Sequence, residues 1–511
     1  MGNSNLLLRV GLAAWRQERS GSWTAERLHR HQQQGLAALR RFAAEHSAFY
    51  GELHRGLEGQ PLEALPIVTK AMLMADFDRV VTDPRLCLGD LEAHLAGAQA
   101  DEPYLGRYTV LSTSGSTGLR GVFVFDEREW TQALAAIARP LAWAGAPPPW
   151  TRPRSAIIAS AAGWHYSARI GSALASRWLP TLRLDAGAPL AELVEKLNAW
   201  QPQALAVYPS VLLQLAEEQL AGRLRIRLRH IGTSAERLPQ ATRRRVHAAW
   251  GIRVFDTYGA TEYAPIATEC REGHLHLLED RAIVEVVDER GRAVPPGEAG
   301  ARLLLTVLDR RTQPLIRYEI SDGVRELPGR CACGRPFRML AGIEGRVEET
   351  LAFAAAGARA GGPARVELHP NLFHELLERV PATGWQVRQE GDGRLAVLLT
   401  GTTHAEAGAL LKAQLAALLA GRGASCPAIE VRWVEGLPRG ASGKAPLILR
   451  TEARTEVRTE VRAEVRAEGQ AEAGTEVRTD TRTDTPSDTP TDMRTDTPTD
   501  IRTDDQPRRA A

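Results

Sequence analysis

The pattern of hydrophobic and polar residues changes several times along this chain of 511 residues. Residues 1–60 are rich in Ala, Leu, Gln and Arg, and their spacing predicts an N-terminal helical segment. Between 105 and 345, short β-rich runs alternate with segments of helical pattern, which predicts parallel sheets covered by helices. The β-rich runs include 155–159, 204–208 and 229–232, and the helical segments include 189–200 and 211–221.

Two later regions follow different patterns. From 281 to 327 the β-rich runs lie close together, separated by turns at 289–291 and 295–297, which predicts a small antiparallel, barrel-like subdomain. After Gly345 the pattern predicts a compact α+β lid over 346–450. Its expected strands and helix lie at 385–389, 394–400, 403–419 and 429–434. The predicted fold class is therefore α/β, with a large core at 61–345 that precedes the lid.

The C-terminal residues fall into tetrapeptides. Units of Thr-Glu-Val-Arg give way to Thr-Asp-Thr-Pro between 451 and 506. Few large apolar residues and repeated prolines leave little to bury, so we expect a disordered tail over 451–511 without chemistry of its own.

Composition narrows the class of protein. A content of 43% hydrophobic and 25% charged residues is typical of globular proteins, and a net charge of +2 favours neither a nucleic-acid nor a membrane partner. Five cysteines are too few for a disulfide framework, so we expect a cytoplasmic protein. Only four of the 64 basic residues are lysines, which makes a lysine inside a motif more informative. The oligomeric state stays open, a homodimer included.

A run of hydroxyl and glycine residues, Thr113–Gly118, precedes the β-rich run 122–125. Glycines let a backbone approach an anion closely, and hydroxyls add hydrogen-bond donors, so the run is a candidate phosphate loop. An ordinary polar loop is the alternative for this run alone.

Four further motifs follow in order, at 231–236, 255–262, 316–322 and 437–444. Each has an ordinary interpretation when taken alone. Thr261 could cap a helix, Arg317 and Asp322 could form a surface ion pair, and Lys444 could be a solvated loop charge. These interpretations give no reason for all the motifs to occur together in this order.

Together the motifs resemble those of the adenylate-forming superfamily of acyl-CoA synthetases and adenylation domains, over about 60–450. Within it, the chain resembles phenylacetate–CoA ligases and coenzyme F(390) synthetases, and the stretch Ser114–Val124 looks most like the latter. The resemblance implies that 61–345 is an AMP-binding core. It also implies an ATP- and Mg²⁺-dependent ligase that converts a small carboxylic acid to an acyl-adenylate and then uses coenzyme A. AMP transfer to a hydroxyl acceptor is one alternative, and a non-catalytic nucleotide-binding protein is another.

The resemblance implies a nucleotide site built from these motifs. The residues that would hold the β- and γ-phosphates are Thr113, Ser114, Gly115, Ser116, Thr117 and Gly118. Ser234, Ala235 and Glu236 would line the adenine pocket, Tyr258 would stack on the base, and Gly259 would also bind the nucleotide. Thr261 would contact the α-phosphate, Glu262 would hold Mg²⁺, and Asp322 would accept both ribose hydroxyls. Arg346 would lie near the nucleotide and the domain hinge.

The resemblance also makes Lys444 the catalytic cation, acting with Thr261 and Glu262. A carboxylate that attacks the α-phosphate builds negative charge, which a nearby ammonium stabilises. The neighbouring Gly440 and Gly443 suggest a mobile loop.

Some positions depart from the superfamily pattern. Leu119 and Arg120 stand where a lysine is usual, and Glu348 stands where the hinge is often aspartate. His165 occupies a place where relatives often have an aromatic or histidine gate beside the acyl pocket, and a packed or surface histidine is the alternative.

A separate group of residues suggests a metal site. Cys331 and Cys333 form a C-x-C pair, and Cys270 lies upstream, followed by His274 and His276. Three thiolates and one imidazole suit a tetrahedral zinc site, and similar positions occur in phenylacetate–CoA ligase relatives. We predict a structural zinc ion at Cys270, His276, Cys331 and Cys333, with His276 preferred to His274. Three buried cysteines with a surface histidine are the alternative.

Overall fold

The computed structural model describes most of the chain before the tail. The described residues are 3–97, 102–113, 120–146, 151–160, 165–174, 179–346, 351–356, 365–368, 370–377, 380–382, 384–401, 405–439 and 445–450. Ser114, Gly115, Ser116, Thr117, Gly118 and Lys444 lie outside them, as do Leu119, Glu348 and the predicted tail. Arg346 is described for its backbone only.

The N-terminal helical segment is confirmed by α1 (Asn3–Glu18), α2 (Ala25–His46) and α3 (Ala48–Leu53). Helix α2 begins where the Thr24 hydroxyl accepts a hydrogen bond from the Arg27 N–H, and it buries Leu28, Leu36, Leu39 and Ala43 on one face. The shorter α4 (Lys70–Ala75), α5 (Phe77–Val80) and α6 (Leu88–Gly97) follow.

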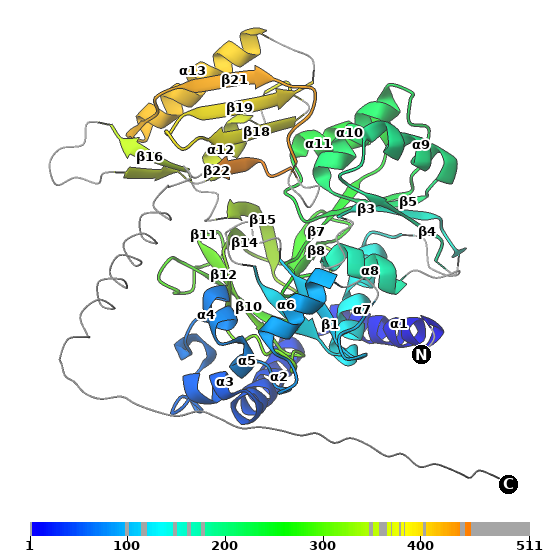
Figure 1. Ribbon diagram of the computed structural model, residues 1–511, viewed down its shortest axis with the longest axis vertical. Helices are drawn as coiled ribbons and strands as arrows, with labels where there is room; N and C mark the ends of the chain where they lie inside the picture. The colour runs from blue at the N-terminus through cyan, green and yellow to red at the C-terminus, as the bar shows by residue number, and fades with distance from the viewer. Residues whose placement is uncertain are drawn as a thin grey trace, which may run out of the picture. The chain divides into compact units, whose positions relative to one another are not determined.

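The centre of the core is a sheet of ten strands, in the order β11-β14-β15-β9-β8-β7-β6-β5-β3-β4. Five of these strands are parallel and match the predicted alternation: β3 (Ser155–Ala159), β4 (Thr181–Asp185), β5 (Ala204–Val207), β6 (His230–Ser234) and β7 (Val254–Tyr258). Helices α9 (Leu190–Trp200), α10 (Pro209–Leu220) and α11 (Gln240–Trp250) gather over the parallel strands (Figure 1) and pack on them through one apolar cluster. The predicted parallel sheet with covering helices is confirmed.

The sheet is mixed, because its other half is antiparallel. Its strands are β8 (Ala267–Glu269), β9 (Leu275–Leu277), β11 (Ala299–Gly300), β14 (Asp322–Leu327) and β15 (Met339–Arg346). The connections around β8 are too short for the crossover that parallel pairing needs, so the chain reverses direction. A second antiparallel sheet of β10 (Ala282–Val287), β12 (Arg302–Val307) and β13 (Tyr318–Ile320) lies in the predicted barrel-like region.

The predicted phosphate loop joins two antiparallel strands, β1 (Thr109–Ser112) and β2 (Val122–Phe125). Helix α7 (Glu127–Trp143) follows β2, and its N-terminus has a capping box formed by Asp126 and Glu129. Helix α8 (Tyr166–Leu174) follows β3. Within the described ranges, no helix is both long enough and apolar enough to cross a bilayer.

The C-terminal region has the α+β composition that the sequence predicts. Its elements are β16 (Leu351–Ala355), β17 (Arg365–Leu368), α12 (Pro370–Leu377), β18 (Gly384–Gln389), β19 (Leu395–Thr400), α13 (Ala405–Gly421), β20 (Ala424–Ser425), β21 (Ile429–Trp433) and β22 (Ile448–Arg450). Four strands form a sheet in the order β21-β19-β18-β22, and a separate apolar cluster includes Phe353, Phe373, Val397 and Leu415. The domain boundaries remain predictions.

Candidate functional site

Two of the predicted motifs meet through buried hydrogen bonds. The Tyr258 hydroxyl, at the end of β7, donates to Asp322 Oδ2 at 2.6 Å. The Tyr318 hydroxyl on β13 donates to Glu262 Oε1 at 2.9 Å. All four side chains are buried. Motifs 255–262 and 316–322 therefore converge, as the hypothesis of one shared site requires.

Each of the two carboxylates accepts a hydrogen bond from the hydroxyl group of a tyrosine. A buried carboxylate needs such donors because it has lost water. The phenol groups fix the orientation of Glu262 and Asp322, the residues predicted to hold Mg²⁺ and ribose. Tyr318 belongs to the predicted motif 316–322, but its role could not be predicted, because its approach to Glu262 depends on the pairing of distant segments.

The pairing of strands β14 and β15 shows where the backbone of Arg346 lies. In the β14–β15 pair, Asp322 lies opposite Arg346, at the end of the ladder. The backbone of Arg346 is therefore adjacent to the Tyr258–Asp322 pair, which is consistent with its predicted location near the nucleotide.

Ser234, a predicted adenine-pocket residue, ends β6 and is paired in register with Thr257 of β7, and Ala235 and Glu236 follow it. Ala235 has φ 69°, a left-handed conformation that is uncommon for a residue with a side chain. The Glu236 carboxylate accepts hydrogen bonds from Ser210 N and Ala445 N, both at 2.9 Å. The segment that directly follows Lys444 thus contacts the 231–236 motif.

The base of the predicted phosphate loop is closed by backbone and side-chain hydrogen bonds. Thr113 N donates to Gly121 O at 2.9 Å, and Gly121 N donates to Thr113 Oγ1 at 2.8 Å. A side chain at Gly121 would stand 2.8 Å from the Phe123 ring, so the backbone approach requires glycine. Arg120, which follows the predicted phosphate loop, donates through Nε to Ser112 Oγ.

Asp256 is a further titratable residue near the site. It lies on β7, two residues before Tyr258, and the sequence analysis did not identify it. The Thr233 hydroxyl on β6 donates to Asp256 Oδ1 at 2.8 Å. Burial is the largest influence on Asp256 and raises the pKa of its carboxyl to about 6, although the Thr233 hydrogen bond opposes the shift. Nothing in the sequence FDTYG distinguishes an aspartate that is partly buried and hydrogen-bonded from an exposed one.

Two of the ordinary interpretations are wrong. Arg317 forms its ion pair with Glu285 at 3.0 Å, is 4% exposed, and therefore forms no surface pair with Asp322. Thr261 lies in the loop after β7, and no helix begins there, so it is not a helix cap. His165 is buried, which excludes the surface alternative but leaves its role beside the acyl pocket a prediction.

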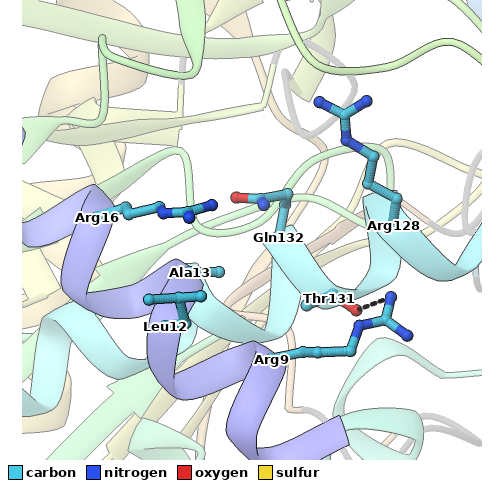
Figure 2. A pocket seen from close by; sticks show the side chains of 7 residues that line it. All are labelled: Arg9, Leu12, Ala13, Arg16, Arg128, Thr131 and Gln132. Carbon is cyan, nitrogen blue, oxygen red and sulfur yellow. Dashed lines mark hydrogen bonds between the residues drawn. The ribbon is translucent and has the colours of Figure 1, made fainter.

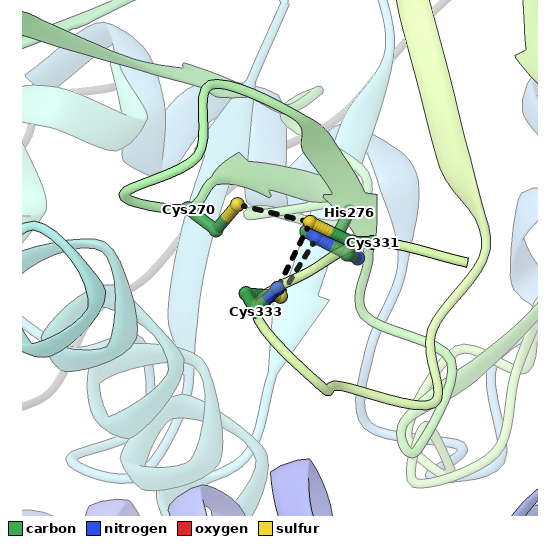
Figure 3. Close-up of side chains that lie close together, drawn as sticks. All are labelled: Cys270, His276, Cys331 and Cys333. Atoms are coloured by element: carbon green, nitrogen blue, oxygen red, sulfur yellow. Dashed lines mark hydrogen bonds between the residues drawn. The ribbon is translucent and has the colours of Figure 1, made fainter.

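The cysteine and histidine residues of the predicted metal site converge. The donor atoms of Cys270, His276, Cys331 and Cys333 all lie within 4.8 Å of one another (Figure 3). His276 is fully buried, so the alternative of a surface histidine is wrong. His274 is also close, with Nδ1 3.2 Å from Cys331 Sγ. The group could hold a metal ion.

The distances between these donor atoms fit a zinc ion with tetrahedral coordination. Two sulfurs bound to one zinc at about 2.3 Å each stand about 3.8 Å apart. The Sγ atoms of Cys270 and Cys331 are 3.7 Å apart, and Cys333 Sγ is 3.3 Å from His276 Nε2. His276 Nδ1 lies 3.1 Å from the Phe337 carbonyl, a partner that directs Nε2 toward the thiols.

The comparisons with known proteins agree with this geometry. Residues 89–304 match the family described as AMP-binding enzyme. A phenylacetate–coenzyme A ligase of Thermus thermophilus is 27% identical over 55% of this chain and 63% of its own length. One of Pseudomonas putida is 32% identical over 31% of this chain and 37% of its own length, and one of Escherichia coli is 29% identical over 47% and 55%. The chain thus spans less than two thirds of these relatives.

Solved structures show the same fold. A 2-hydroxyisobutyryl-CoA ligase in the postadenylation state matches with a TM-score of 0.62 and 20% identity, over 88% of this chain and 94% of that one. The same enzyme in the thioesterification state matches with a TM-score of 0.53.

Residues 89–304 therefore resemble the AMP-binding enzyme family, and the chain is similar to phenylacetate–coenzyme A ligases, as the sequence motifs indicate.

The raised pKa of Asp256 predicts a pH-dependent loss of stability. The folded carboxyl keeps its proton up to about pH 6, whereas the unfolded one ionises near 3.8. The unfolding free energy should therefore fall as pH rises from about 4 to about 6, and change little above. We expect the melting temperature of the unaltered protein to fall relative to Asp256→Asn over this interval.

Asp392→Asn is the control for this measurement. Asp392 is exposed, and hydrogen bonds from the backbone and side chain of Arg394 lower the pKa of its carboxyl. The contribution of Asp392 to the unfolding free energy should therefore change with pH in the opposite direction. A difference between the unaltered protein and Asp256→Asn that does not change with pH would contradict the assignment.

Proposed function

We propose that this protein is an ATP-dependent ligase that activates a small carboxylic acid as an acyl-adenylate and then transfers the acyl group to coenzyme A. The convergence of motifs 255–262 and 316–322 through the Tyr258–Asp322 hydrogen bond carries the proposal, because it joins the expected base and ribose residues in one site. The relatives named phenylacetate–coenzyme A ligase support it.

Each residue of the site has a distinct task in this proposal. Asp322, oriented by Tyr258, accepts the two ribose hydroxyls, for which a carboxylate has enough lone pairs. Glu262, oriented by Tyr318, would hold Mg²⁺, which supplies positive charge beside the phosphates. Thr113–Gly118 binds the β- and γ-phosphates, and Thr261 contacts the α-phosphate.

Lys444 stabilises the negative charge that develops when the substrate carboxylate attacks the α-phosphate. The carboxylate oxygen forms a bond to phosphorus, and pyrophosphate leaves with the electrons of the broken P–O bond. The contact between Ala445 N and Glu236 supports this role, since Ala445 directly follows Lys444 in the chain and Glu236 belongs to the 231–236 motif.

ATP–pyrophosphate exchange across a panel of aryl and aliphatic acids tests the proposal. Lys444→Ala should lower exchange by about 100-fold or more, the usual cost of one transition-state contact, while ATP affinity changes little. Lys412→Ala, on the exposed face of α13, is the matched control and should retain full exchange. A protein that binds ATP but shows no exchange with any acid would count against a ligase and favour a nucleotide-binding protein.

The resemblance of Ser114–Val124 to coenzyme F(390) synthetases favours one alternative, transfer of AMP to a hydroxyl acceptor. That reaction would leave AMP stably attached to the product and need no coenzyme A. Mass spectrometry of products formed with and without coenzyme A distinguishes it from the proposed ligase.

The Tyr318–Glu262 hydrogen bond should control the response to magnesium. Tyr318→Phe removes a donor to a buried carboxylate, an interaction of about 1.5–3 kcal/mol. We expect the Mg²⁺ concentration for half-maximal exchange to rise about tenfold. Tyr108→Phe is the control, because Tyr108 is another buried tyrosine that donates to a carboxylate, that of Asp83. Equal magnesium dependence in both variants would show that Tyr318 has only a packing role.

We also propose that Cys270, His276, Cys331 and Cys333 bind a structural zinc ion, as the donor distances allow. Purified protein should contain about one zinc ion per chain. His276→Ala should lose the ion and lower the melting temperature, whereas His274→Ala should retain it. Zinc well below one per chain, or equal zinc in both variants, would reject this assignment.

A further inference from the structure

Helix α1 presents an apolar ridge to solvent. Seven large hydrophobic side chains are exposed in the described part of the chain, and three of them are Leu8, Leu12 and Trp15, at 72%, 48% and 57% exposure. Spacings of four and three residues place all three on one face of the helix. Exposed apolar residues usually occur singly, so a continuous ridge indicates an interaction surface.

The opposite face of α1 is fixed to the core. Val10 and Ala13 are buried, and Gln17 Nε2 donates to the Gln132 carbonyl of α7 at 3.1 Å. The ion pair between Arg9 and Glu127 adds a second link between the same helices. The ridge cannot turn inward without breaking these contacts, so its exposure is a stable property of the fold.

A cavity beside the ridge is lined by arginines. It has a volume of about 230 Å³ and lies between α1 and α7, with Leu12 and Ala13 among its lining residues. In Figure 2, Arg16 of α1 and Gln132 of α7 extend toward one another across it, and Arg128 stands above. No ion pair joins Arg16 or Arg128 to an acid among the residues described, so their positive charge is available to a partner.

Arg19 extends the positive rim along the ridge. Its guanidinium lies 5.0 Å from the centre of the Trp15 ring, so one end of the ridge combines an aromatic surface with a cation. The apolar ridge is thus bordered by arginines on its α7 side and at its Trp15 end, which matches a helix whose apolar stripe is bordered by acidic residues.

We propose that the α1–α7 groove docks an acidic amphipathic helix of a protein partner. This proposal is independent of the catalytic activity. A second copy of the chain fits less well, because a two-fold contact of this face would bring arginines against arginines. A membrane also fits less well, since the ridge spans only about 10 Å and α1 is held by its inner face, whereas interfacial helices bury a longer apolar face.

The test uses the full-length protein and two labelled peptides of about 18 residues. One has leucines at spacings of four and three residues between flanking glutamates, and the other has lysines in place of the glutamates. Fluorescence anisotropy should show binding of the acidic peptide only, and binding should weaken as ionic strength rises from about 0.05 to about 0.5 M.

Matched variants locate the site. Leu12→Ser and Arg128→Glu should each weaken binding of the acidic peptide by about tenfold or more. Leu410→Ser and Arg290→Glu are the controls, because they change an exposed leucine and an exposed arginine outside the α1–α7 groove. Both variants should bind the acidic peptide as tightly as the unaltered protein does. Thermal melting of each variant confirms that it is folded.

Four outcomes would overturn the proposal. They are failure of the acidic peptide to bind, equal binding of the lysine peptide, equal loss in the control variants, and binding that Leu12→Ser leaves intact. Two further measurements identify the rival occupants. Sedimentation with phosphatidylserine vesicles that depends on Leu12, without peptide binding, would indicate a membrane surface. A dimer in light scattering that Leu12→Ser converts to a monomer would indicate a second copy of the chain.

Discussion

The structure of the proposed nucleotide site depends on two buried hydrogen bonds between tyrosines and carboxylates. Tyr258 and Asp322 are 64 positions apart in sequence, and Glu262 and Tyr318 are 56 apart. A carboxylate removed from water is costly unless donors satisfy it, so these pairs favour the arrangement in which β7, β13 and β14 come together. The same bonds that stabilise the fold therefore orient the groups that the proposed ligase requires.

The sheet supplies the frame for this convergence. The parallel strands β5, β6 and β7 are paired in register, so the segments that follow them emerge at one edge. The change to antiparallel pairing after β7 brings β14 and β15 into the same sheet and places Asp322 opposite Arg346. A sheet that was parallel throughout would need a longer crossover after each strand, and the motif at 316–322 would have no short route back to this edge.

The sequence predicted the elements of this fold well, because strand and helix periods are local properties. The strands β3, β5 and β6 and the helices α9 and α10 lie close to the predicted ranges. The mixed character of the sheet was missed, because pairing direction is set by contacts between distant segments. The motifs identified Tyr258, Glu262 and Asp322, but the roles of Tyr318 and Asp256 could not be predicted. Tyr318 acts on a residue 56 positions away, and the pKa of Asp256 depends on burial.

The rigidity of α1 has its own physical source. The guanidinium of Arg139 on α7 forms a buried ion pair with Asp280 and donates to the Gln17 carbonyl at the end of α1. Glu18 accepts a hydrogen bond from Trp143 Nε1, and the Trp143 ring contacts His276 of the candidate metal site edge-on. Helix α1 is thus connected through Trp143 to the cysteine and histidine side chains. A ridge that is already ordered loses little entropy when a partner binds, which favours docking on a preformed surface over folding upon binding.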